Sequence, residues 1–132
     1  MIDLHCHLLP GIDDGAKTLE DALAMAKLAV DNGIHKAVVT PHITPGRYDN
    51  DIQSISACFK QFNQALVEQA ITLEVAMAAE VRLDPLILSM VATDTLPLLG
   101  ELDGMNIMLL EFPHGTLPPG ALETVQWLIK RN

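Results

Sequence analysis

The feature that most constrains the fold is a regular alternation of short, extended apolar segments with longer segments of helical periodicity. The extended segments are expected near residues 2–6, 35–40, 72–78 and 106–111. Strands that alternate with helices are typical of parallel α/β folds, in which each helix crosses one face of the sheet to reach the next strand. The sequence therefore predicts an α/β chain of parallel strands with crossover helices.

Helical segments fill the intervals between these strands. Thr18 has the position of an N-cap with Asp21 three residues on, and Asn32-Gly33 supplies the stop. Further helices are expected at residues 51–69, just after Pro85, and at 119–130. Because a crossover helix normally leads to another parallel strand, we expect residues 1–132 to be a contiguous part of a larger α/β unit.

Charge and composition restrict the partners of this chain. Eight basic and seventeen acidic side chains give a formal net charge of −9, which repels nucleic acid and anionic lipid. The apolar runs are far shorter than the roughly 20 residues that cross a bilayer, and no secretory signal is recognisable. Cys6 and Cys58 lack the spacing of a paired motif. We therefore expect a reduced, cytoplasmic protein without membrane insertion or nucleic-acid binding.

The strongest chemical signal is His5-Cys6-His7 at the end of the first expected strand. Residues two apart in a strand point to the same side, so both imidazoles can converge on one cation while Cys6 turns away. Two neutral imidazoles suit manganese, iron or zinc better than magnesium or calcium. An alternative stays open, in which the two histidines are incidental polar residues at a strand end.

Potential ligands also follow the other expected strands. Asp13 and Asp14 lie in a glycine-flanked loop after the first strand, where they could act as ligands or merely shape a turn. His42, Glu80 and Glu111 end the next three strands. Parallel α/β folds place ligands at the carboxyl edge of the sheet, and such a cluster could hold two or three cations. Neighbouring cations clamp a phosphate and activate a water, which favours phosphate-ester hydrolysis.

These motifs resemble the PHP (polymerase and histidinol phosphatase) superfamily, and within it the tyrosine phosphatases of bacterial capsule and exopolysaccharide operons. The resemblance rests on MIDLHCHLLPGIDDGAKT at residues 1–18 and on blocks at 40–42, 46–48, 79–81 and 110–113. It implies the amino-terminal half of a distorted (β/α)7 TIM-like barrel, with residues 1–132 as a partial PHP domain. The second half of the family fold supplies another histidine, an aspartate–histidine pair and phosphate-binding arginines, which have no counterpart in this sequence.

The resemblance also implies a reaction. Metal-ligand roles fall on His5, His7, Asp14, His42, Glu80 and Glu111. Asp14 and Arg47 are the expected catalytic residues, and Mn²⁺, or else iron or zinc, is the expected cofactor, with two or three ions in the complete site. The implied reaction is hydrolysis of phosphotyrosine by a metal-bound hydroxide. The implied partner is a bacterial tyrosine kinase of polysaccharide export, and the uncovered edge of a half-barrel makes a homo-oligomer a further expectation.

Some polar residues near the expected site have two interpretations. Arg47 and Tyr48 follow His42, where a cation could meet an incoming phosphate, but an ordinary surface pair is an equal alternative. His35 is expected at the surface, and Arg82 and Asp84 are expected to form a local ion pair. His114 is expected to be a plain loop residue, with contact to the substrate as the alternative. Two functional alternatives also stay open: a different phosphoester substrate, such as histidinol phosphate or a nucleotide, and a non-catalytic fragment that binds only a metal or a partner.

Overall fold

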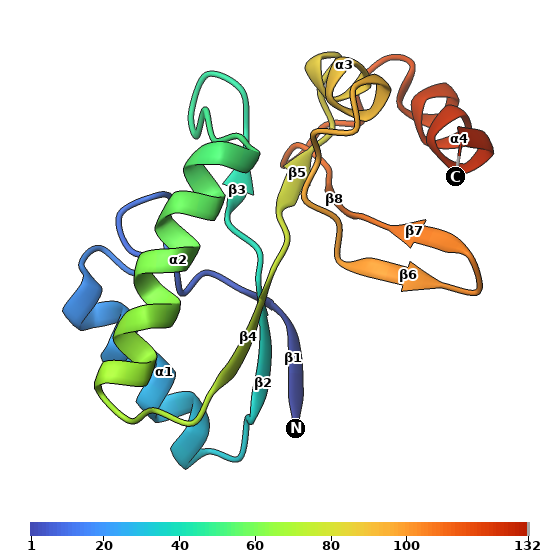
Figure 1. The fold of residues 1–132 in the computed structure, drawn as a ribbon. Helices are drawn as coiled ribbons and strands as arrows, with labels where there is room; N and C mark the ends of the chain where they lie inside the picture. Colours follow the sequence, from blue (N-terminus) through green and yellow to red (C-terminus); the bar gives the residue numbers. More distant parts are fainter. Residues whose placement is uncertain (132) are drawn as a thin grey trace.

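The computed structural model describes residues 1–131 and contains two short parallel sheets that follow one another along the strand direction (Figure 1). The first sheet has the order β1-β2-β4 and the second has the order β3-β5-β8. Their strands are β1 (Ile2–Cys6), β2 (Lys36–Val39), β3 (His42–Ile43), β4 (Glu74–Met77), β5 (Glu80–Arg82) and β8 (Leu109–Glu111). The pairings within both sheets are parallel, which confirms the predicted α/β arrangement.

Two of the predicted strands are each followed, after a short break, by a strand of the second sheet. The prediction at residues 35–40 corresponds to β2, and β3 follows it after Thr40 and Pro41. The prediction at residues 72–78 corresponds to β4, and β5 follows it after Ala78 and Ala79. Pro41 has no backbone N–H with which to continue the ladder. The two breaks lie side by side on neighbouring strands. His42 and Glu80 therefore begin the second sheet as direct register partners.

The fourth predicted strand is wrong in part. Residues 106 and 107 belong to β7 (Met105–Ile107), which pairs antiparallel with β6 (Gly100–Leu102), and β8 alone joins the parallel sheet. Asp103 and Gly104 connect the two hairpin strands with φ angles of +53° and +80°. An Asp-Gly pair in this left-handed conformation favours a two-residue hairpin turn. The apolar residues 107–110 run across the boundary between β7 and β8, so the sequence pattern does not mark it.

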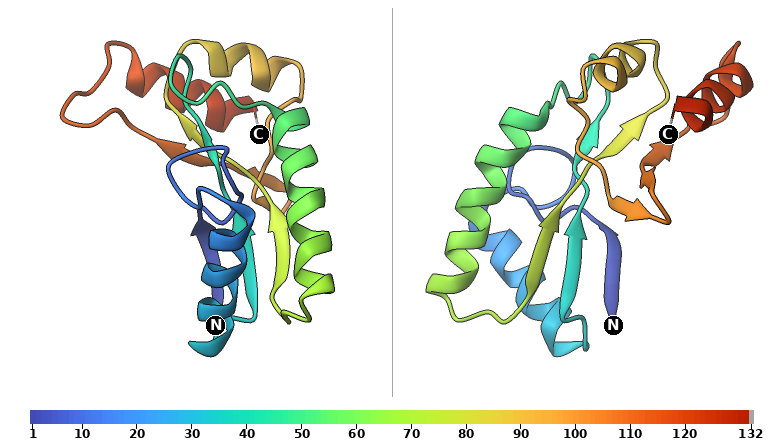
Figure 2. Two further views of the ribbon diagram at one scale, coloured as in Figure 1. Left: turned by 90° about the vertical axis from the view of Figure 1, so that its left-hand side faces the viewer. Right: turned by 45° about the vertical axis from the view of Figure 1, so that its right-hand side comes forward.

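Helices α1 (Leu19–Asp31) and α2 (Ile52–Glu68) cover the same face of the first sheet (Figures 1 and 2). The capping box predicted for α1 is confirmed, because Thr18 Oγ1 accepts from the Asp21 N–H and the Asp21 carboxylate accepts from the Thr18 N–H. Asp51 caps α2 through a similar reciprocal arrangement with Ser54. The buried face of α2, including Phe62, joins the strands in one apolar core.

Two shorter helices accompany the second sheet. Helix α3 (Leu86–Ala92) follows Pro85 as predicted, and α4 (Ala121–Arg131) occupies the predicted final helical segment. A mostly apolar hollow of about 390 Å³ lies between α3, the hairpin, β8 and α4. Within residues 1–131, no helix combines the length and the apolar character that crossing a membrane requires.

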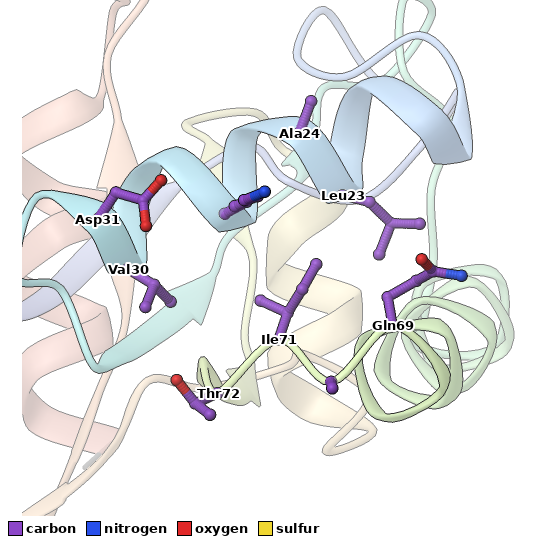
Figure 3. Close-up of a pocket in the computed structure, with 9 residues that line it drawn as sticks. Leu23, Ala24, Val30, Asp31, Gln69, Ile71 and Thr72 are labelled. Carbon is purple, nitrogen blue, oxygen red and sulfur yellow. The ribbon is translucent and has the colours of Figure 1, made fainter.

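A second hollow, of about 480 Å³, lies between α1 and the segment that joins α2 to β4 (Figure 3). Leu23, Val30 and Ile71 line it together with the polar Asp31 and Gln69. This hollow is beside the amino end of β4, and none of the expected metal ligands lines it. The expected ligands lie toward the other ends of the strands of the first sheet.

Candidate metal centre

The six side chains predicted as metal ligands gather where the first sheet gives way to the second. They are placed as follows: His5 in β1, His7 just after it, Asp14 in the following loop, His42 at the start of β3, Glu80 at the start of β5 and Glu111 at the end of β8. Their ligand atoms form three overlapping groups, and within each group all atoms lie within 4.8 Å of one another. The groups are His5–His7–Glu80, His7–Asp14–His42 and His42–Glu80–Glu111. The structure therefore brings all six together, at the junction of two sheets instead of at an outer rim.

Glu80 stands at the centre of this cluster. Its Oε2 atom lies 3.0 Å from His5 Nε2, 3.2 Å from His7 Nε2 and 3.4 Å from His42 Nδ1. The Nε2 atoms of His5 and His7 are 3.3 Å apart, as expected for neighbours on the same side of a strand. Glu80 is buried, whereas the His5 side chain is 47% exposed. One side of the cluster is therefore open to solvent.

The adjacent carboxylates Asp13 and Asp14 have different surroundings. The Asp13 side chain is fully buried, and its Oδ2 accepts hydrogen bonds from His7 Nδ1 at 2.8 Å and from the His42 backbone N–H at 3.1 Å. Its Oδ1 accepts from the Gly15 N–H at 2.9 Å. Asp14 is half exposed, with its Oδ1 atom 3.3 Å from His42 Nε2. Asp14 thus faces the cluster, while Asp13 lies outside all three ligand groups.

Hydrogen bonding shifts the pKa values of His7 and Asp13 in opposite directions. The bond to Asp13 raises the pKa of His7 above its ordinary value and outweighs the opposing effect of burial. Burial alone would raise the pKa of Asp13, but the hydrogen bonds from His7, Gly15 and His42 together lower it. Asp13 is therefore ionised at neutral pH and accepts the proton on His7 Nδ1, which leaves His7 Nε2 directed at Glu80.

His42 has a buried Nδ1 atom without a hydrogen-bond partner within residues 1–131. The carboxylate oxygens near it are Glu80 Oε2 at 3.4 Å and Glu111 Oε2 at 3.6 Å. An unsatisfied buried polar atom costs on the order of 1–3 kcal/mol. A divalent cation between this nitrogen and the two carboxylates would satisfy it. Imidazole nitrogens and carboxylate oxygens together fit manganese, iron or zinc.

Arg82 pairs with Glu111, so the expected ion pair with Asp84 is wrong. Arg82 Nε donates to Glu111 Oε2 at 2.9 Å and Arg82 Nη2 donates to Oε1 at 2.7 Å. These two residues are register partners on β5 and β8, and both side chains are mostly buried. Asp84 instead accepts a hydrogen bond from the Leu86 N–H at the start of α3. The planar guanidinium therefore fixes the orientation of the Glu111 carboxylate.

Arg47 and Tyr48 flank His42 in a layered arrangement. The Tyr48 ring is stacked on the His42 ring, with 5.4 Å between centroids and 10° between planes. The Arg47 guanidinium carbon lies 5.0 Å from the Tyr48 centroid, and Arg47 is exposed. Arg47 thus lies in the loop beside the cluster, where its charge is accessible to an anion.

Two further residues support the cluster and were not singled out from the sequence. Asn50 Nδ2 donates to the Ile12 carbonyl at 2.9 Å and to the His42 carbonyl at 2.8 Å, which joins the aspartate loop to the start of β3. Gly15 lies so close to His7 that an added Cβ would come within 2.1 Å of the His7 carbonyl oxygen. The Asp-Asp-Gly sequence could have indicated the role of Gly15. For Asn50, the sequence offers no indication beyond its position before the helix cap Asp51.

The other histidines and the cysteines lie outside the cluster. His35 is exposed beside the Met1 amino group, as expected, and the His114 side chain is 93% exposed and 4.0 Å from Glu111 Oε1. Burial raises the pKa of Cys6 to about 12, and Cys6 Sγ contacts the Val38 carbonyl on the side away from the imidazoles. Burial also raises the pKa of Cys58. Both thiols are protonated at neutral pH, so neither is suited to act as a thiolate nucleophile.

The fold and the cluster define a parallel α/β protein with the donor set of an imidazole–carboxylate metal centre. The chain belongs to the family described as "Capsular polysaccharide synthesis, CpsB/CapC", which it matches over residues 1–125. It is similar to the tyrosine-protein phosphatase YwqE of Bacillus subtilis (strain 168), with 35% identity over 118 residues, 89% of this chain and 45% of the relative. It is also similar to the putative tyrosine-protein phosphatase CapC of Staphylococcus aureus, with 27% identity over 121 residues and the same two coverages.

A solved structure shares the fold of this chain. It is described as "Crystal structures of YwqE from Bacillus subtilis and CpsB from Streptococcus pneumoniae, unique metal-dependent tyrosine phosphatases". The match has a TM-score of 0.86 at 33% sequence identity and covers 99% of this chain and 52% of the solved chain. The present chain therefore spans about half the length of the relatives it matches.

Proposed function

We propose that this chain is the metal-binding, amino-terminal half of a metal-dependent protein-tyrosine phosphatase that acts in capsule or exopolysaccharide synthesis. The observation that carries the proposal is the convergence of three imidazoles on Glu80 Oε2. The proposed ligands are His5, His7, Asp14, His42, Glu80 and Glu111, and the proposed cofactor is Mn²⁺, with iron or zinc as alternatives. The relatives named as tyrosine phosphatases and the family described by capsular polysaccharide synthesis support the choice of reaction and process.

The chemistry proposed for this cluster divides between the cations and the protein. Bound divalent ions would lower the pKa of a coordinated water and stabilise charge on the transferring phosphoryl group. Arg47 lies in the loop after His42 with its guanidinium exposed, so we assign it to binding the phosphate. Asp14 is half exposed next to His42, so we assign it to orienting the attacking water as well as to metal binding. The raised pKa of Cys6 argues against a cysteine nucleophile at this site.

The domain proposal follows from the relative lengths. We infer that residues 1–132 form a partial PHP domain, the amino-terminal half of a distorted (β/α)7 barrel, because the chain covers 52% of the solved relative. Further ligands and phosphate-binding arginines would then come from a second half. The proposed substrate is a phosphotyrosine protein, with a bacterial tyrosine kinase of polysaccharide export as the partner. The unpaired Cys6 and Cys58 support a cytoplasmic location.

Metal binding and hydrolysis can be tested separately on the 132-residue chain. Titration calorimetry with MnCl₂ after removal of bound metal should give saturable binding, and His5→Ala or His7→Ala should weaken it by at least about tenfold. His35→Ala is the matched control, because His35 is exposed outside the cluster. Equal manganese affinity in the wild type, both cluster variants and the control would reject the metal site.

Hydrolysis of p-nitrophenyl phosphate and of a phosphotyrosine peptide, each with added manganese, tests the reaction. Phosphate release that is lost in His5→Ala and retained in His35→Ala would support it. Rates of phosphate release from histidinol phosphate and from nucleotides are compared at the same concentration. Faster release from either one would mean that it, and not phosphotyrosine, is the substrate. Tight manganese binding without release of phosphate from any of them would favour the alternative of a non-catalytic fragment.

A further inference from the structure

Both carboxylate oxygens of Asp13 accept hydrogen bonds from groups inside the protein. Oδ2 accepts from His7 Nδ1 and from the His42 N–H, Oδ1 accepts from the Gly15 N–H, and the side chain is fully buried. Asp13 also lies outside the three groups of potential ligand atoms. A buried carboxylate that accepts a hydrogen bond from a ring nitrogen pointing away from the cluster is placed to orient that ring.

The same carboxylate oxygen contacts two different parts of the cluster. His7 follows β1, whereas His42 begins β3 and lies 29 positions from Asp13 in the sequence. Asn50 provides a second connection between the same two segments. Its side chain donates to the His42 carbonyl and to the carbonyl of Ile12, the residue before Asp13. Through these bonds, a displacement of Asp13 would move the His7 ring and the His42 backbone together.

We propose that Asp13 is a positioning residue that sets both the ring orientation of His7 and the placement of His42, and that it is not itself a metal ligand. The proposal rests on the assignment of His7 and His42 as metal ligands. A carboxylate that accepts the Nδ1 proton fixes the neutral imidazole in the tautomer whose Nε2 lone pair is free. In His7 that lone pair points at Glu80 and His5, where a cation would bind. Removal of such an outer partner typically weakens metal binding by about 10–100-fold.

The first test reads the tautomer of His7 in the metal-free wild-type chain by long-range ¹H–¹⁵N NMR of the imidazoles, at a pH where His7 is neutral. We expect Nδ1 to carry the proton and Nε2 to show the shift of an unprotonated nitrogen. Because no metal is added, this result is independent of whether the proposed phosphatase function is correct. A His7 ring protonated at Nε2 would overturn the proposal.

The second test compares Asp13→Asn with Asp31→Asn, which removes the same charge from an exposed position on α1. We expect Asp13→Asn to lower manganese affinity by about 10–100-fold in calorimetry and to populate the second tautomer of His7. Asp31→Asn should leave both unchanged. Circular dichroism reports whether Asp13→Asn folds, and if it does not, the wild-type tautomer decides alone. A folded Asp13→Asn chain with the manganese affinity and the His7 tautomer of the wild type would contradict the proposal for Asp13. If the wild-type chain itself binds no manganese, the proposed function is contradicted, and the tautomer of His7 still tests the proposal for Asp13.

Discussion

The phenol ring of Tyr48 lies nearly parallel to the imidazole of His42, with 10° between their planes and 5.4 Å between their centroids. This contact restrains the His42 ring, whereas Asp13 and Asn50 bind the His42 backbone. Stacked aromatic pairs of this kind contribute about 0.5–1.5 kcal/mol beyond the area they bury. Tyr48 is therefore expected to limit the rotation of a side chain whose two ring nitrogens face different carboxylates.

Tyr48→Phe should keep the manganese affinity of the wild type, because it keeps the ring. Tyr48→Ala should lower the affinity by about 2–10-fold, the equivalent of the stacking energy. Calorimetric titration of the two variants in parallel is the measurement. A loss in Tyr48→Phe as large as that in Tyr48→Ala would mean that the hydroxyl group matters more than the stacked ring.

Gly15→Ala should disturb the site more than the fold. The added methyl group would meet the His7 carbonyl oxygen at 2.1 Å and the His7 Cβ at 2.5 Å, so His7 or the loop must move. We expect weaker manganese binding by at least tenfold, with a lower melting temperature. Gly33→Ala is the control, because its φ of +83° strains an alanine while no atom lies within 4 Å. The unfolding free energy of Gly33→Ala should fall by about 1 kcal/mol, while its manganese affinity should equal that of the wild type.

Arg82→Met tests whether the mostly buried Glu111 carboxylate needs a nearby positive charge for stability. Removing one partner of a mostly buried pair leaves the Glu111 carboxylate uncompensated, so the metal-free chain should lose about 1–3 kcal/mol of unfolding free energy. Added manganese should then raise the melting temperature more in Arg82→Met than in the wild type, since the cation replaces the guanidinium charge. The exposed pair Lys36–Glu74 provides the control: Lys36→Met should change stability by less than about 0.5 kcal/mol. Equal stabilisation by manganese in wild type and Arg82→Met would contradict this account of Glu111.

The His7–Asp13 pair predicts a pH window for the stability of the metal-free chain. The pKa of Asp13 is lowered from 3.8, so its contribution is present above that value and is lost as pH falls through the folded pKa. The pKa of His7 is raised from 6.5, so its contribution is present below that value and is lost as pH rises through the folded pKa. The difference in unfolding free energy between wild type and Asp13→Asn should therefore be largest at about pH 4–6.5. Urea unfolding in EDTA at pH 5, 7 and 9 measures it, and a difference that grows from pH 5 to pH 9 would contradict the prediction.

Local features of the sequence were sufficient for much of the fold. The capping box of Thr18 and Asp21 depends only on residues three apart, and the direction of His5 and His7 depends only on the period of a strand. The turn signal at Asp103-Gly104 is equally local, but no hairpin was predicted there and the end of β7 was missed. Helix caps and strand periodicity, whose signals span only a few residues, are the features that the sequence predicted correctly.

The sequence alone therefore predicts the succession of elements, the family resemblance and the residue types that could bind a metal. Only the three-dimensional fold shows that Asp14 faces the cluster while Asp13 is buried behind His7, because burial depends on how the loop folds back onto β1. It also decided that Arg82 pairs with Glu111, 29 positions away, and not with Asp84. Contacts of this kind follow from strand register and loop packing between distant segments, which no local pattern of residues encodes.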